Sequence, residues 1–139
     1  MTVTFCGHGN YKYSTKVKES LYRTLEKLIK EGADKFYLGG YGDFDLLLAE
    51  TLKKLKEIYP KIESILVIPY LNKSYSMLLY DSSIYPPIEN TPPKFAIVKR
   101  NEWMVEKSDV VISFVEHDFG GAYKTLAYAE KKKKQIIRI

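Results

Sequence analysis

Residues 100–125 read R-N-E-W-M-V-E-K-S-D, V-V-I-S-F-V, E-H-D-F and G-G-A-Y-K-T, which predicts a helix, a buried strand and a glycine turn that opens another helix. A glycine turn between a strand and a helix leaves backbone N–H groups free to point at an anion. Arg100 stands just upstream and can add a planar fork of hydrogen-bond donors. The stretch therefore indicates a ligand that carries a phosphate.

The rest of the chain alternates strands with helices. Short apolar runs predict strands at 2–6, 35–38, 62–70, 109–115 and 135–139, and apolar residues at helical spacing predict helices at 17–29 and 44–59. Ser14 or Thr15 is suited to cap the first helix, and Gly32 to end it. This order predicts an α/β fold, a single doubly wound parallel sheet of about five strands with helices on both faces. We expect residues 1–139 to form one domain.

Composition narrows the class of protein. With 139 residues, 45% hydrophobic and 28% charged, the chain has the balance of a folded domain rather than a disordered one. The net charge of +5 is concentrated partly in Lys131–Lys134, where lysines suit the end of a helix. A single cysteine, Cys6, excludes an intrachain disulfide and a cysteine-built zinc site, and we expect neither metal nor cofactor. No apolar run reaches the length of a membrane span and no secretory leader is visible, so we expect a cytoplasmic protein.

Glycine-bearing turns follow three of the predicted strands. Gly7 and His8 follow the first, Gly39, Gly40, Gly42, Asp43 and Asp45 the second, and Gly120, Gly121 and Thr125 the strand at 109–115. Because parallel strands end at the same edge of a sheet, these turns should gather where such folds bind ligands. None matches a P-loop or a G-x-G-x-x-G fingerprint, so neither a P-loop NTPase nor a standard dinucleotide site is indicated.

Several of these motifs resemble one known family. The opening T-V-T-F-C-G-H and the turn G-G-Y-G-D-F-D resemble the first two loops of YpsA-like proteins. Arg100, Met104, Ser108 and Asp109 fit the LOG pattern R-x-x-x-M-x-x-x-S-D, and G-G-A-Y-K-T stands where LOG proteins have G-G-x-G-T. The chain thus resembles the SLOG superfamily, the Rossmann-like group of LOG phosphoribohydrolases, the DprA core and YpsA-like proteins, and is most similar to the YpsA-like branch.

The resemblance implies a nucleotide or nucleotide-derived ligand at the C-terminal edge of the sheet, held by a sensor or binding protein. The alternative is a LOG-like phosphoribohydrolase that cleaves the N-glycosidic bond of a nucleoside 5′-monophosphate. LOG enzymes use an arginine, matched by Arg100, and a glutamate, at whose position Tyr128 stands here. Asp43, Asp45, Glu116 or Asp118 could supply the missing carboxylate, which such chemistry needs near the ribose.

These considerations give a set of candidate residues. Arg100 and Asp45 are the catalytic candidates. The ligand-binding candidates are Gly7, His8, Gly39, Gly40, Gly42, Asp43, Asp45, Tyr85, Arg100, Gly120, Gly121, Ala122 and Thr125. His8 could act on a ligand near neutral pH or simply bond its own loop, whereas His117 is expected to be a surface residue.

A long loop at about 72–97 follows the third strand and holds four of the chain's six prolines. Loops of this length in a compact domain are usually functional or disordered, and its tyrosines argue against disorder. One interpretation is a lid that brings Tyr80, Asp81 and Tyr85 to a base or ribose. The other is a covering or interface loop.

A nucleotide-like small molecule is the expected partner. Basic residues are dispersed and no stripe of basic and aromatic residues is evident, which argues against a nucleic acid. Pairing into a homo-oligomer is a further expectation, since LOG-like proteins pair through helices.

Overall fold

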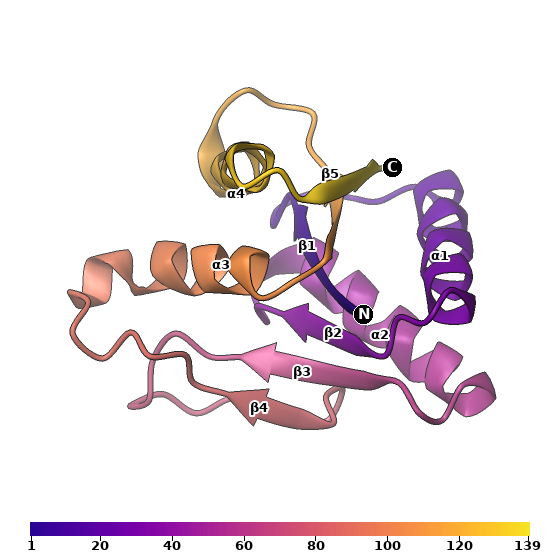
Figure 1. Ribbon diagram of the computed structural model, residues 1–139, viewed down its shortest axis with the longest axis horizontal. Helices are drawn as coiled ribbons and strands as arrows, with labels where there is room; N and C mark the ends of the chain where they lie inside the picture. Colours follow the sequence, from indigo (N-terminus) through magenta and orange to yellow (C-terminus); the bar gives the residue numbers. More distant parts are fainter.

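The computed structural model describes residues 1–139 and centres on a six-stranded parallel sheet with the strand order β4-β3-β2-β1-β5-β6 (Figure 1). The elements are β1 (Thr2–Gly7), α1 (Thr15–Lys30), β2 (Lys35–Leu38), α2 (Gly42–Ile58), β3 (Glu63–Val67), β4 (Ser82–Ile84), a 3₁₀ turn (Pro93–Phe95), α3 (Ala96–Glu106), β5 (Val110–Phe114), α4 (Gly120–Lys131) and β6 (Gln135–Arg138). The predicted α/β fold is confirmed.

β1 lies in the middle of the sheet, paired with β2 on one side and with β5 on the other. Its residues from Val3 to Cys6 are buried, as are all five residues of β5. Strands covered by helices on both faces have no polar side to present, which explains the continuous apolar run V-V-I-S-F. The expectation of a strand there is confirmed.

The helices cover the two faces of the sheet in pairs. α1 packs against α2, and α3 packs against α4, which also contacts β1. Figure 1 shows α3 and α4 together, apart from α1 and α2. The chain therefore winds in one direction from β1 to β4 and in the other from β5 to β6. This reversal falls between β1 and β5, where an open crevice forms at the carboxyl ends of the strands.

The start of α1 follows from its cap. The Ser14 hydroxyl accepts a hydrogen bond from the Val17 N–H at 3.2 Å, so one of the orphan donors of the first turn is satisfied. Leu21, Leu25 and Leu28 then fall on one face and are buried. Ser14 is the cap, and the helix ends just before Gly32, which has a positive φ of 111°.

β4 lies inside the predicted loop and adds a sixth strand at the edge of the sheet, beside β3. The Asp81 carboxylate fixes it there, since it accepts a hydrogen bond from the Ser64 N–H at 2.8 Å and pairs with the Lys56 ammonium at 2.8 Å. Asp81 therefore holds the sheet edge together rather than approaching a ligand. Tyr80 packs against the main core cluster.

Gly7 allows α2 to approach the end of β1 closely. A Cβ built on Gly7 would lie 2.2 Å from a ring carbon of the buried Phe44. We expect Gly7→Ala to lower the free energy of unfolding by about 1–3 kcal/mol, because a ring in a packed core must move to accept the methyl group. Gly121→Ala is the control, since nothing lies within 4 Å of its Cβ position. Urea unfolding of both variants measures the difference, and equal stabilities would contradict this packing role.

Candidate functional site

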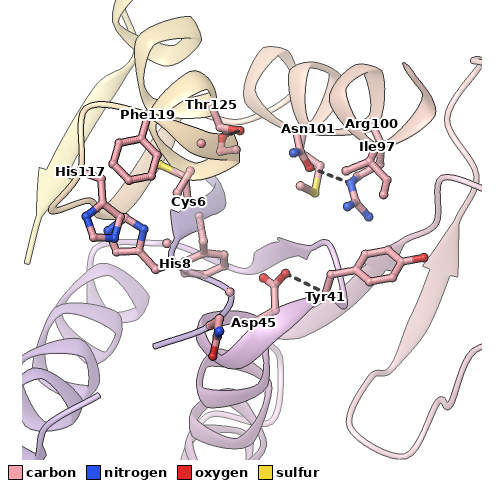
Figure 2. Close-up of a pocket in the computed structure, with 18 residues that line it drawn as sticks. Cys6, His8, Tyr41, Asp45, Ile97, Arg100, Asn101, His117, Phe119 and Thr125 are labelled. Carbon is pink, nitrogen blue, oxygen red and sulfur yellow. Dashed lines mark hydrogen bonds between the residues drawn. The ribbon is translucent and has the colours of Figure 1, made fainter. Parts of the chain in front are cut away.

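A cavity of about 490 Å³ opens at the carboxyl ends of β1 and β5, at the reversal of the winding. Its volume falls within the range of pockets that hold small molecules. Figure 2 shows the side chains that surround it, contributed by the loops after β1 and β5 and by α2, α3 and α4. The lining residues are Phe5, Cys6, Gly7, His8, Gly9, Asn10, Tyr41, Asp45, Ile97, Arg100, Asn101, Met104, His117, Phe119, Gly120, Gly121, Ala122 and Thr125.

The first turn of α4 forms one wall of the cavity. Phe119 precedes the helix without a capping side-chain hydrogen bond, and the first turn contains no acidic residue. Gly120 has a positive φ of 90°, and the Cβ positions of Gly120 and Gly121 face open space. The first N–H groups of a helix have no intrahelical acceptor and carry partial positive charge, so this wall favours an anion.

The first turn of α2 forms another wall of the cavity, and this wall carries negative rather than positive charge. It contains two acidic residues, Asp43 and Asp45. The Asp45 carboxylate accepts a hydrogen bond from the Tyr41 N–H at 3.2 Å, and the Asp43 carboxylate accepts one from the Tyr11 N–H at 3.0 Å. These acids already occupy the positive end of the helix, so this wall disfavours an anion and suits hydroxyl or amino groups.

Asp45 is the one carboxylate among the residues that line the cavity. Burial raises the pKa of Asp45 to about 6, although the charge of Arg100 and the N–H groups of Tyr41 and Gly39 lower it in part. The carboxyl therefore changes its charge close to neutral pH, which is the behaviour that general acids and bases need.

Arg100 is fixed in the wall beside Asp45 and is only 2% exposed. Its Nη1 donates to the carbonyls of Gly39 and Val67, each at 2.7 Å, and its Nε donates to Asn101 Oδ1 at 2.8 Å. Burial lowers the pKa of Arg100 from its usual value, and the Asp45 charge partly restores it. Since Nη2 has no acceptor in the protein, the guanidinium presents a fixed, partly unused donor group at the cavity.

His8 connects the two loops at the winding reversal. Its Nε2 accepts a hydrogen bond from the Glu116 N–H at 2.8 Å, which places the proton of the neutral ring on Nδ1. Burial lowers the pKa of His8, and the neighbouring His117 lowers it further. His8 thus bonds the adjacent loop and also lines the cavity, and its action on a ligand stays a prediction.

His117 is a surface residue, as expected, but it also belongs to the cavity wall. Its ring is exposed yet lines the cavity, with its centroid 4.2 Å from that of His8 and 5.0 Å from that of Phe119 (Figure 2). Cys6 also lines the cavity, but burial raises the pKa of its thiol to about 12, so it is not a nucleophile at neutral pH.

The structure brings eight of the candidate residues to the cavity, namely Gly7, His8, Asp45, Arg100, Gly120, Gly121, Ala122 and Thr125. Their roles toward a ligand remain predictions. Five other candidates do not line it, namely Gly39, Gly40, Gly42, Asp43 and Tyr85.

The candidates outside the cavity shape the turns around it. The Gly39 carbonyl accepts from Arg100, and Asp43 holds the Tyr11 N–H. Gly40 and Gly42 have positive φ values of 77° and 90°, which a side chain would strain. Tyr85 directly follows the edge strand β4. Two strands, β3 and β2, separate β4 from β1 and the reversal of the winding, so Tyr85 lies away from the cavity.

Several lining residues were missed in the sequence, including Tyr41, Asn101, His117 and Phe119. Helical spacing was an available signal for Ile97 and Met104, which stand three residues before and four after Arg100. The structure contains no group of three or more histidine, cysteine or acidic side chains arranged to hold a metal ion. None of its helices is both long and apolar enough to cross a membrane.

A parallel, doubly wound sheet with a ligand-sized cavity at its winding reversal defines a Rossmann-like α/β protein. Residues 8–138 match the model of the YspA SLOG family, and the chain belongs to this family. The resemblance found in the motifs is thereby confirmed.

Curated relatives support the same branch. The chain is 26% identical over 138 residues to UPF0398 protein BH1768 of Halalkalibacterium halodurans, covering 91% of this chain and 73% of that protein. It is 23% identical over 134 residues to a UPF0398 protein of Bacillus thuringiensis (strain Al Hakam), covering 86% and 72%.

A solved structure of DNA processing protein A from Helicobacter pylori, described for its single-stranded DNA binding mode, has a similar fold. The TM-score is 0.69 at 21% identity, and the match covers 99% of this chain but 64% of that one. This finding contradicts the expectation against a nucleic acid as a partner, because the fold occurs in a protein described for binding single-stranded DNA. Dispersed basic residues do not exclude such a partner, because phosphates also bind to backbone N–H groups and helix N-termini, which no count of lysines reveals.

Proposed function

We propose that the cavity binds a nucleotide or nucleotide-derived ligand and that the protein acts as a sensor or ligand-binding protein. The phosphate lies at the first turn of α4, and the sugar hydroxyls lie toward Asp45. The observation that carries this proposal is the contrast between the two helix N-termini at the cavity, of which only that of α2 is occupied by acidic side chains. A ligand with one anionic end and one hydroxyl-rich end matches both walls.

A charge at position 121 tests the phosphate site. We expect Gly121→Asp to weaken the binding of adenosine 5′-monophosphate (AMP) at least tenfold, because the new carboxylate would compete with the phosphate for the N–H groups of α4. Gly121→Asn has the same shape without the charge and should bind more tightly than Gly121→Asp. Isothermal titration calorimetry measures both affinities.

The stability of the two variants provides the control. An acidic residue in the first turn favours a helix, so Gly121→Asp should unfold at no lower urea concentration than the unsubstituted protein. Equal AMP affinities for the two variants would show that the phosphate does not lie at α4. Failure of the unsubstituted protein to bind any nucleotide would overturn the proposal itself.

The nucleotide unit can also belong to a single strand of nucleic acid, which presents the same phosphate and base. Two lysine–aromatic pairs lie in the chain between β3 and α3, with Lys73 Nζ 4.4 Å from the Tyr70 ring centroid and Lys94 Nζ 5.1 Å from that of Phe95. Such pairs suit stacked bases and a charged backbone. Competition between AMP and a short oligothymidylate, repeated at increasing salt, distinguishes a free nucleotide from a strand, because affinity for a strand falls steeply with salt.

Cleavage of an N-glycosidic bond is the second candidate function, and the position of Asp45 favours it. The residue in the place of the LOG glutamate, Tyr128, hydrogen-bonds Glu106 and does not line the cavity. Of the acids considered from the sequence, only Asp45 lines it, so Asp45 is the carboxylate that would stabilise an oxocarbenium ion or activate water. Incubation with AMP followed by chromatography for free adenine tests this activity, and Asp45→Asn should abolish the release.

A further inference from the structure

Tyr41 offers a flat aromatic surface within the cavity. It stands at the N-cap of α2, lines the cavity and is 42% exposed, although it is large and mostly apolar. Its backbone N–H donates to Asp45, so the main chain of Tyr41 is held at the proposed sugar-binding carboxylate while its ring extends away from that group (Figure 2). Figure 2 shows Tyr41 and Arg100 on one side of the cavity, with His117 and Phe119 on the other.

Arg100 lies close to this ring and is held in place. Its guanidinium carbon is 5.5 Å from the centroid of the Tyr41 ring, within the range of a cation–π contact. Hydrogen bonds to two strand-end carbonyls and to Asn101 hold the guanidinium in place. Arg100 therefore acts less as a mobile phosphate clamp than as a rigid cationic support for an aromatic surface.

We propose that Tyr41 is the stacking surface for the base of the ligand, with Arg100 fixed beside it. This inference rests on the proposed nucleotide binding and names the part of the cavity that recognises the base. The guanidinium of Arg100 lies against the tyrosine ring, and the exposed part of the ring leaves aromatic surface on which a planar base can stack. A base stacked on Tyr41 has its sugar beside Asp45, and the cavity then continues toward the phosphate wall at α4.

A comparison of two ligands tests the assignment. AMP carries a base, whereas ribose 5-phosphate has the same sugar phosphate without one. We expect Tyr41→Ala to weaken AMP binding about tenfold, because stacking a base on an aromatic side chain contributes that much affinity, and to leave ribose 5-phosphate affinity within twofold. Tyr41→Phe keeps the ring and should retain AMP binding.

Two further variants distinguish the loss of base stacking from a general change in the structure. Tyr41→Trp places an indole on the surface, and its fluorescence should change on addition of AMP but not of ribose 5-phosphate. Tyr123→Ala removes another exposed tyrosine that does not line this cavity, and it should leave both affinities unchanged.

The outcomes separate the two proposals. Unchanged AMP affinity in Tyr41→Ala, or equal losses for AMP and ribose 5-phosphate, would overturn the stacking role while leaving nucleotide binding intact. Absence of AMP binding to the unsubstituted protein would overturn nucleotide binding and the stacking role with it.

Discussion

Replacing Arg100 with alanine is expected to lower the free energy of unfolding by about 3 kcal/mol, because two buried carbonyls lose their donor. The Gly39 and Val67 carbonyls lie at the ends of β2 and β3, and both accept from Arg100 Nη1. Urea unfolding measures the loss. The neighbouring Lys99→Ala removes an exposed cation paired only with Glu102 at 3.4 Å and should change stability by less than about 0.5 kcal/mol.

A lysine at the same position distinguishes charge from geometry. Arg100→Lys keeps the positive charge but lacks the planar fork that bonds both carbonyls and Asn101. We expect a stability between those of Arg100→Ala and the unsubstituted protein. If Arg100→Ala were as stable as Lys99→Ala, the guanidinium would not be holding the two strand ends. The proposal that Arg100 is a rigid support for the Tyr41 ring would then be wrong as well.

Replacing Asp45 with asparagine is expected to stabilise the protein near neutral pH by about 2 kcal/mol while weakening its ligand binding. The pKa of Asp45 is raised from 3.8 to about 6 in the folded protein, mainly by burial. The folded state therefore binds this proton more tightly than the unfolded chain does. The contribution of Asp45 to stability is fully present below pH 3.8 and is lost as the pH rises through 6. Asparagine cannot ionise, so the variant avoids that loss.

Urea unfolding at several pH values between 4.5 and 7.5 tests this expectation, since the stability difference between Asp45→Asn and the unsubstituted protein should grow as the pH rises. Glu50→Gln is the matched control, because Glu50 is an exposed acid on the same helix, α2. A difference that stayed constant with pH would contradict the raised pKa. A gain in stability combined with a loss of AMP binding is the signature of a residue kept for function.

The sequence predicted the fold because its periodic signals were local and strong. The strand formed by V-V-I-S-F and the cap formed by Ser14 can each be recognised from residues only a few positions apart in the chain. β4 was missed for the opposite reason. Its residues S-S-I carry no apolar pattern, and the strand depends on Asp81 contacts with Lys56 and Ser64 in other elements.

The cavity was predicted in outline from the glycine turns, but its detailed contacts were not. A motif singled out Arg100, but its hydrogen bonds to Val67 and Gly39 span 33 and 61 residues, separations that no motif encodes. His117 reached the cavity wall through a loop whose path depends on the pairing of β1 with β5. The contacts of Arg100 and the location of His117 therefore depend on where the fold places these residues and not on their residue types.

The pairing of β1 with β5 also has a consequence for biosynthesis. The Thr2 N–H donates to the Asp109 carboxylate across 107 residues of chain, so β1 completes its pairing only after the much later segment β5 has been made. Pairing over such separations is slow to form and leaves strand edges exposed in the meantime. The nascent chain can assemble β1, β2 and β3 with α1 and α2, but the cavity forms only after α3 and α4, which supply part of its lining, are in place. A chain that stalls before β5 would be partly folded, would lack the cavity and would expose the unpaired edge of β1, the kind of surface that chaperones protect.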